Sequence, residues 1–95
     1  MNYVRGASET YFCLLPAPSE HVGAGYHRKR VGLNHLAFSA SSRAVVDAVA
    51  TWVRDNGHTL LYADRHPYAG GANYYAAFCE DPDRLKLEVV ASSEA

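Results

Sequence analysis

Cysteine, methionine and tryptophan are scarce in this chain of 95 residues, which has two cysteines, one methionine and one tryptophan. A small secreted domain normally carries a denser set of cysteines, so we do not expect a fold held together by disulfides. Cys13 and Cys79 each lie in an apolar, strand-like run, which is typical of reduced and buried thiols. We therefore expect a cytoplasmic protein.

Long apolar runs and an excess of charge are also missing. No stretch approaches the roughly 20 apolar residues of a membrane-spanning helix, and residues 1–5 do not begin a signal peptide. Nine Lys and Arg against ten Asp and Glu give a net charge of -1. A nucleic-acid-binding protein usually shows a basic excess, so we expect neither nucleic acid nor a membrane as a partner.

The composition that remains is that of one small globular domain. Apolar residues make up 48% of the chain and charged residues 20%, which is the balance of a folded protein. A chain of this length buries only about two-thirds of its extended surface on folding. A partner chain that covers more apolar surface would therefore stabilise it.

The apolar periodicity predicts strands at 31–39, 59–63, 74–80 and 85–91. Between the first two, a helix runs from Ser41 or Ser42 to about Asn56, and its apolar stripe consists of Val45, Val46, Val49, Trp52 and Val53. Two shorter strands are predicted at 3–5 and 11–15 with a turn at 6–8, and 16–27 is a loop rich in Pro, Gly and Ser. The last two strands follow each other through a tight turn and should form an antiparallel hairpin.

His35 and Glu88 are the first candidates for chemistry. Side chains alternate between the two faces of a strand, and the helix should cover the face of Leu36 and Leu87. His35 and Glu88 therefore share the opposite, open face. Imidazole nitrogen and carboxylate oxygen together suit a divalent metal such as Zn, Fe, Mn, Ni or Co. Two ligands are fewer than a catalytic metal normally has, and a lone His or Glu in a strand is more often structural.

Three segments together resemble one module of the vicinal oxygen chelate superfamily: Val31–Phe38, the helix ending at Asn56-Gly57, and Tyr74–Glu88. This superfamily contains glyoxalase I, extradiol dioxygenases, fosfomycin-resistance transferases and bleomycin-resistance proteins. The resemblance implies an α+β fold with a βαβββ module, and it implies that His35 and Glu88 are metal ligands. The turn Asp81-Pro82-Asp83-Arg84 departs from the family's Asp-Pro-Asp-Gly at its fourth residue. A non-glycine residue at a positive φ there costs about 1 kcal/mol, so the turn can differ from the family's.

The resemblance covers residues 31–91 and implies a second module, since family members normally have two in one chain. We interpret residues 1–30 as the remnant of a first module, with an extra N-terminal strand or hairpin and a linker. Residues 31–91 form the complete module and 92–95 a tail. On this interpretation the chain is truncated at its N-terminus.

Further candidates surround the loop that enters the strand at 74–80. Arginine can hold an anionic group of a substrate, and tyrosine or histidine can transfer protons. Arg65 and Tyr75 are the catalytic candidates beside Glu88. The wider set of substrate-binding candidates is Arg65, His66, Tyr68, Tyr74 and Tyr75. Each of them is also compatible with a solvated loop whose rings pack at an interface.

The resemblance thus implies a small metal-dependent enzyme that acts on a substrate with vicinal oxygens. The alternatives are a ligand-binding protein of the bleomycin-resistance type without catalysis, and an inactive truncated member of the family. A homodimer is expected, because it would cover the open face of the sheet and bring two His and two Glu together.

Overall fold

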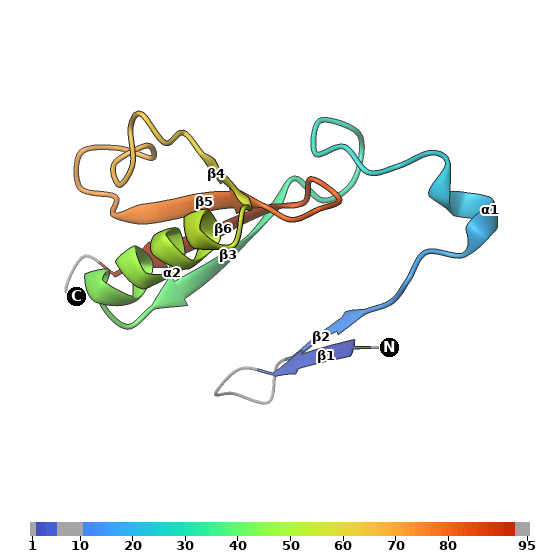
Figure 1. The fold of residues 1–95 in the computed structure, drawn as a ribbon, viewed down its shortest axis with the longest axis horizontal. Helices are drawn as coiled ribbons and strands as arrows, with labels where there is room; N and C mark the ends of the chain where they lie inside the picture. The colour runs from blue at the N-terminus through green and yellow to red at the C-terminus, as the bar shows by residue number, and fades with distance from the viewer. Residues whose placement is uncertain (1, 6–10, 93–95) are drawn as a thin grey trace.

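A computed structural model describes residues 2–5 and 11–92 of the chain (Figure 1). The turn predicted at 6–8 and the end of the tail lie outside these residues. The elements of the described part, in chain order, are β1 (Asn2–Arg5), β2 (Tyr11–Leu14), α1 (Ser19–Val22), β3 (His35–Ala40), α2 (Arg43–Asp55), β4 (Thr59–Leu61), β5 (Ala76–Glu80) and β6 (Lys86–Ala91). None of the helices in this part is long and apolar enough to cross a membrane.

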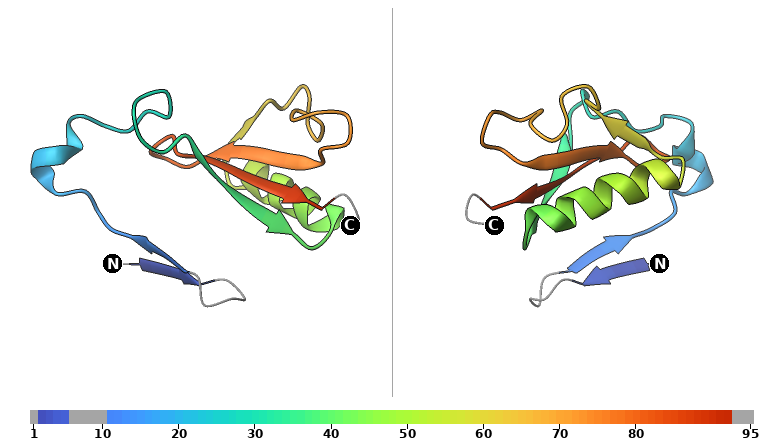
Figure 2. Two further views of the ribbon diagram at one scale, coloured as in Figure 1. Left: turned by 180° about the vertical axis from the view of Figure 1, so that it is seen from behind. Right: turned by 60° about the vertical axis from the view of Figure 1, so that its left-hand side comes forward.

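The main sheet has four strands in the order β3-β6-β5-β4. Strand β3 runs parallel to β6, and the other neighbouring pairs are antiparallel. Helix α2 lies across one face of this sheet, and no helix of the described residues lies on the other face (Figure 2). The order strand, helix, strand, strand, strand predicted from residue 31 onward is therefore correct, and the fold is α+β.

The core lies between α2 and the sheet and is built largely from small side chains. Val46, Ala50 and Val53 recur at spacings of four and three, so they form the inward stripe of the helix. Val46 and Ala50 meet Ala40, Ala77 and Ala91 of three strands. Because alanine methyl groups are short, the helix axis can approach the sheet closely. The side chain of Ser42 accepts a hydrogen bond from the backbone N–H of Val45 and caps the helix, as predicted.

The prediction that Trp52 belongs to the core is wrong. Its side chain is 58% exposed and stacks on the ring of His58, with the centroids 5.3 Å apart. One helical position turns the side chain by about 100°, so the stripe of Val46 and Val53 leaves their neighbours Val45 and Trp52 at its margin. Of the predicted apolar stripe, Val46 and Val53 are buried, whereas Val45 and Trp52 are exposed.

Strand β3 begins at His35 and not at Val31. His35 pairs with Lys86, the first residue of β6, so residues further upstream have no strand to pair with. The backbone carbonyl of Leu33 accepts a hydrogen bond from the Tyr26 hydroxyl instead, at 2.7 Å. Val31 is fully exposed as a result.

In the described part of the chain, two residues other than glycine adopt a positive φ, one directly after β4 and one in the turn before β6. Tyr62, with φ 55°, follows β4, which stops at Leu61 and not at Ala63. Arg84, with φ 68°, closes the turn between β5 and β6, where the resemblance placed glycine. The Asp81 carboxylate accepts hydrogen bonds from the backbone N–H groups of Asp83 and Leu85 and holds this turn. The turn thus keeps the left-handed conformation in spite of the side chain.

Strands β1 and β2 form an antiparallel two-stranded sheet of their own. This hairpin lies beside the β3 edge of the main sheet, and the chain between them passes through the short helix α1, which was not predicted (Figure 1). The ring of Phe12 meets the ring of Phe38 edge-on, with the centroids 5.2 Å apart. Cys79 is buried as predicted, whereas Cys13 is exposed, because a two-stranded sheet cannot cover both of its faces.

Candidate functional site

His35 and Glu88 meet on the open face of the main sheet. Glu88 pairs in register with Ala37, two residues along β3 from His35, so both side chains leave the sheet on the same side. The distance between His35 Nε2 and Glu88 Oε1 is 3.3 Å. The sequence-based expectation that these two side chains share a face is therefore correct.

Glu88 is the only buried charged residue in the described part of the chain. Its side chain is 5% exposed, whereas that of His35 is 34% exposed. The hydroxyl of Tyr74 donates a hydrogen bond to Glu88 Oε2, while Oε1 faces His35 Nε2. This hydrogen bond is the main reason why the pKa of Tyr74 is raised, with burial as the second. Tyr74 therefore stays a hydrogen-bond donor at neutral pH.

Asn34 fixes the orientation of the imidazole. Its side-chain N–H group donates to the backbone carbonyl of Arg28, so its oxygen is turned toward His35. That oxygen lies 2.7 Å from His35 Nδ1, which donates to it. In the neutral ring Nε2 then carries the lone pair, and this lone pair faces Glu88. Two acceptors facing each other are unfavourable unless a proton or a metal cation lies between them.

The pair has the chemistry of half a metal site. A histidine ligand normally donates its other N–H group to an oxygen, as His35 does to Asn34. Two ligand atoms about 2.0–2.2 Å from one ion lie about 3.0–3.4 Å apart at usual coordination angles, and the observed distance is 3.3 Å. No group of three or more His, Cys, Asp or Glu suited to a metal occurs among residues 2–5 and 11–92. The residues present therefore fit two positions around a divalent ion.

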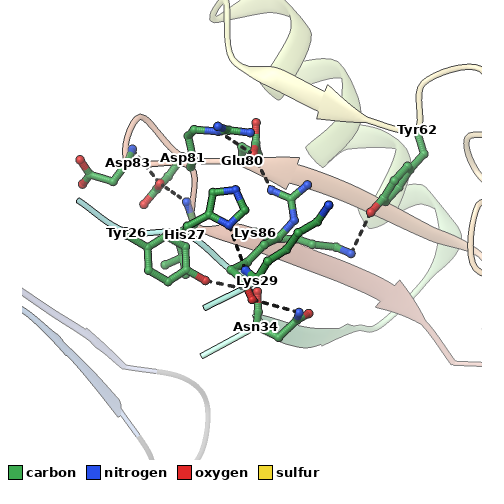
Figure 3. A network of polar contacts seen from close by, with 12 residues as sticks. Tyr26, His27, Lys29, Asn34, Tyr62, Glu80, Asp81, Asp83 and Lys86 are labelled. Atoms are coloured by element: carbon green, nitrogen blue, oxygen red, sulfur yellow. Dashed lines mark hydrogen bonds and ion pairs between the residues drawn. The ribbon is translucent and has the colours of Figure 1, made fainter. Parts of the chain in front are cut away.

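A second cluster lies on the same face of the sheet, over β5 and the end of β4. The Lys86 ammonium donates to the Tyr62 hydroxyl at 3.0 Å (Figure 3). The same Nζ lies 5.3 Å from the centroid of the Phe78 ring, and the Arg65 guanidinium lies 5.0 Å from that of Tyr62. The sequence-based prediction included Arg65 but missed Lys86 and Tyr62. Strand alternation alone placed Lys86 on the face of Glu88 and is the signal that was available.

Glu80 connects this cluster to the segment before β3. Arg28 forms an ion pair with it at 2.8 Å, and both side chains are largely buried. The exposed Arg84 lies on the same Glu80 oxygen at 3.5 Å. Figure 3 shows Glu80 and Lys86 side by side. The backbone carbonyl of Arg28 also accepts a hydrogen bond from the Asn34 side chain. The ion pair therefore stabilises the backbone segment that leads to His35.

Two of the candidate tyrosines lie away from the pair. The hydroxyl of Tyr75 donates to Asp47 of α2, so Tyr75 faces the helix and not the open face. This hydrogen bond is the main cause of the raised pKa of Tyr75. Tyr68 packs edge-on against the Tyr75 ring, with the centroids 5.6 Å apart. The structure therefore brings Tyr74 to His35 and Glu88 and leaves Tyr75 and Tyr68 on the other side.

His66 is half-buried in the loop between β4 and β5. Its backbone N–H donates to the carbonyl of Tyr62, and its peptide bond to Pro67 is cis. In the described part of the chain its ring forms no hydrogen bond or ion pair with His35 or Glu88. Of the five substrate-binding candidates, Tyr74 and Arg65 are thus the two that lie in the clusters of the open face.

Comparisons with known proteins find similarity to a curated protein and to a solved structure. No protein-family model matches the sequence. The uncharacterized protein YqjT of Bacillus subtilis (strain 168) is 51% identical over 83 residues, which are 87% of this chain. The chain spans 65% of the length of that relative.

The second relative is a solved structure. It is the crystal structure of a "putative glyoxalase" from Bacillus halodurans, which is 43% identical and superposes with a TM-score of 0.85. The match covers 95% of this chain and 74% of that one. Likeness of this extent in both sequence and fold is that of homologous proteins. This chain therefore belongs to the glyoxalase-like family.

Proposed function

We propose that the protein is a metal-dependent enzyme of the glyoxalase and dioxygenase type, with a small substrate that carries vicinal oxygens. His35 and Glu88 are the residues that hold the divalent metal ion. One observation carries the proposal: the buried Glu88 carboxylate faces the Nε2 atom of His35 at 3.3 Å, while other partners occupy Glu88 Oε2 and His35 Nδ1.

Burial is the physical reason for a cation at this place. An isolated carboxylate inside a protein is strongly unfavourable, and a charge of the opposite sign relieves this cost. In the described part of the chain no Lys or Arg forms an ion pair with Glu88. A divalent ion held by His35 and Glu88 would supply the missing positive charge and would relieve the repulsion between the two lone pairs.

The metal, when bound, polarises the substrate oxygens and stabilises the negative charge that develops on them. The chain's own residues do the positioning. Asn34 fixes the ring of His35 through Nδ1, and Tyr74 holds the Glu88 carboxylate through Oε2. Glu88 is catalytic as a ligand beside the reacting atoms. Tyr75 faces α2, so the proposal uses Tyr74 in its place.

A second copy of the chain is proposed to complete the site. A catalytic metal normally has three protein ligands and one open position, whereas the described residues offer two. A homodimer with twofold symmetry brings a second His35 and a second Glu88 to the same face. The exposed side chains of Leu33 and Tyr74 on this side of the molecule are then covered.

Metal binding tests the proposal directly. The wild-type protein and the variants His35→Ala, Glu88→Gln and His58→Ala are stripped with a chelator and titrated with Co²⁺ or Zn²⁺ at neutral pH. We expect tight binding by the wild type and its loss, by about a hundredfold or more, in the first two variants. His58→Ala is the matched control, because His58 stacks on Trp52 outside the pair, and its affinity should equal that of the wild type.

The same titration separates the alternatives. Equal metal affinity in the wild type, His35→Ala and Glu88→Gln would contradict the proposed centre. A wild-type protein that binds none of the divalent ions would favour a binding protein without catalysis or an inactive family member. Far-ultraviolet circular dichroism of each variant shows whether loss of binding is loss of folding.

A further inference from the structure

Lys86 holds its charge on the open face of the sheet without a carboxylate partner in the described part of the chain. Its ammonium group donates to the Tyr62 hydroxyl at 3.0 Å and lies about equally far from two rings, 5.0 Å from the centroid of Tyr62 and 5.3 Å from that of Phe78. These contacts fix the position of the amine and use one of its three N–H groups. The others remain for a ligand.

The nearby carboxylate is engaged elsewhere. Glu80 pairs in register with Lys86 across β5 and β6. Its Oε2 atom, however, forms ion pairs with Arg28 Nη1 at 2.8 Å and with Arg84 Nε at 3.5 Å. Arg65 adds another cation 5.0 Å from the centre of the Tyr62 ring. The cations of Lys86, Arg28 and Arg65 thus act on the Tyr62 hydroxyl, whereas the carboxylates of Glu80 and Glu88 on this face have other partners, in a chain whose net charge is -1. The excess of positive charge is local.

The backbone conformation and the packing of Tyr62 hold its hydroxyl in place beside the Lys86 amine. Tyr62 has a positive φ of 55°, which is unfavourable for an aromatic residue and is retained where the surroundings require it. Its ring packs edge-on against the buried Phe78, with the centroids 5.5 Å apart. Its pKa is lowered, chiefly by the hydrogen bond from Lys86 and further by the charges of Lys86, Arg28 and Arg65. The lowered pKa agrees with a positive potential at the hydroxyl.

The distance from this cluster to the proposed metal pair suits a small molecule. Lys86 and Glu88 leave β6 on the same face and are two residues apart, which is about 7 Å along a strand. Phe78, on which the Lys86 amine lies, pairs in register with Glu88 on the neighbouring strand. A molecule of a few carbon atoms can therefore contact both groups.

We propose that Lys86, positioned by Tyr62 and assisted by Arg65, binds an anionic oxygen group of the substrate, either a carboxylate or a phosphate. Combined with the proposed function, on which this second step rests, the substrate class is a small organic acid or phosphate ester. Its vicinal oxygens lie at His35 and Glu88, and its negative charge lies at Lys86. The anion site itself does not require the metal.

The test measures anion binding on metal-free protein. Chelator-treated protein with ¹³C-labelled tyrosine rings is titrated at low ionic strength with inorganic phosphate and, separately, with acetate. The resonance of Tyr62 is assigned by Tyr62→Phe. We expect a saturable shift of this resonance with at least one anion, and the responding anion distinguishes phosphate from carboxylate. Lys86→Gln should weaken the affinity about tenfold or more, the size of one charge-assisted hydrogen bond.

Controls separate this proposal from the metal site. Arg54→Gln removes an exposed cation from α2 and should bind the anion as the wild type does. His35→Ala should lose metal affinity and keep anion affinity, so that either proposal can fail alone. Equal affinity in Lys86→Gln and the wild type, no saturable shift with either anion, or loss of anion binding in His35→Ala would overturn the anion site. An amide spectrum confirms that each variant is folded.

Discussion

Single tyrosines on the two faces of the sheet have different surroundings. Tyr75 donates to Asp47 on the helix side, and this hydrogen bond raises its pKa. Tyr62 on the open face accepts a hydrogen bond from Lys86, and its pKa is lowered. The two rings therefore titrate in opposite directions from the ordinary value, and their removal should change the response of the fold to alkaline pH in opposite ways.

The sign of each effect follows from linkage. A raised pKa in the folded state gives stability that is present below the unfolded value, about 10, and is lost as the pH rises through the folded value. Tyr75→Phe lacks this loss, so its stability should fall less steeply than that of the wild type between about pH 9 and 11. Tyr62→Phe should fall more steeply, because ionised Tyr62 favours the folded state as the pH rises. Urea denaturation across this range measures both slopes, and equal slopes would contradict the assignment.

At the scale of the elements, the orientation of α2 decides which face of the sheet stays open. Val46 is fully buried and its neighbour Val45 is 39% exposed. We expect Val46→Ala to lower the free energy of unfolding by about 2 kcal/mol, and Val45→Ala by less than about 1 kcal/mol. The pair is matched in chemistry and in helix propensity. Equal losses would mean that the helix presents a different stripe to the sheet.

Sequence periodicity was sufficient for the order of the elements from residue 31 onward and for the shared face of His35 and Glu88, because strand alternation depends only on counting residues. It failed where tertiary contacts decide. The rotation of α2 depends on how closely Ala50 can approach Ala40 and Ala77, so Trp52 was misplaced. The start of β3 depends on where β6 offers a partner. Asn34 and Lys86 were missed because their importance comes from the neighbours that folding brings to them.

At the scale of the whole molecule, the open face and the incomplete ligand set lead to the same expectation. The four-stranded sheet has α2 on one side only (Figure 2). Exposed leucines lie at the end of β2 and just before β3, namely Leu14, Leu15 and Leu33. We expect sedimentation at micromolar concentration to give a dimer of the 10.4 kDa chain. Addition of the metal should strengthen the dimer in the wild type and leave it unchanged in His35→Ala. A monomer at all concentrations, with and without metal, would contradict the shared site.

The central claim is that His35 and Glu88 hold one metal ion, and anomalous X-ray diffraction from crystals soaked in Co²⁺ or Zn²⁺ tests it most directly. The account predicts an anomalous peak within bonding distance of both His35 Nε2 and Glu88 Oε1, with Asn34 still on Nδ1 and Tyr74 still on Oε2. A well-ordered pair with no anomalous density, or an ion bound only at other residues, would contradict it.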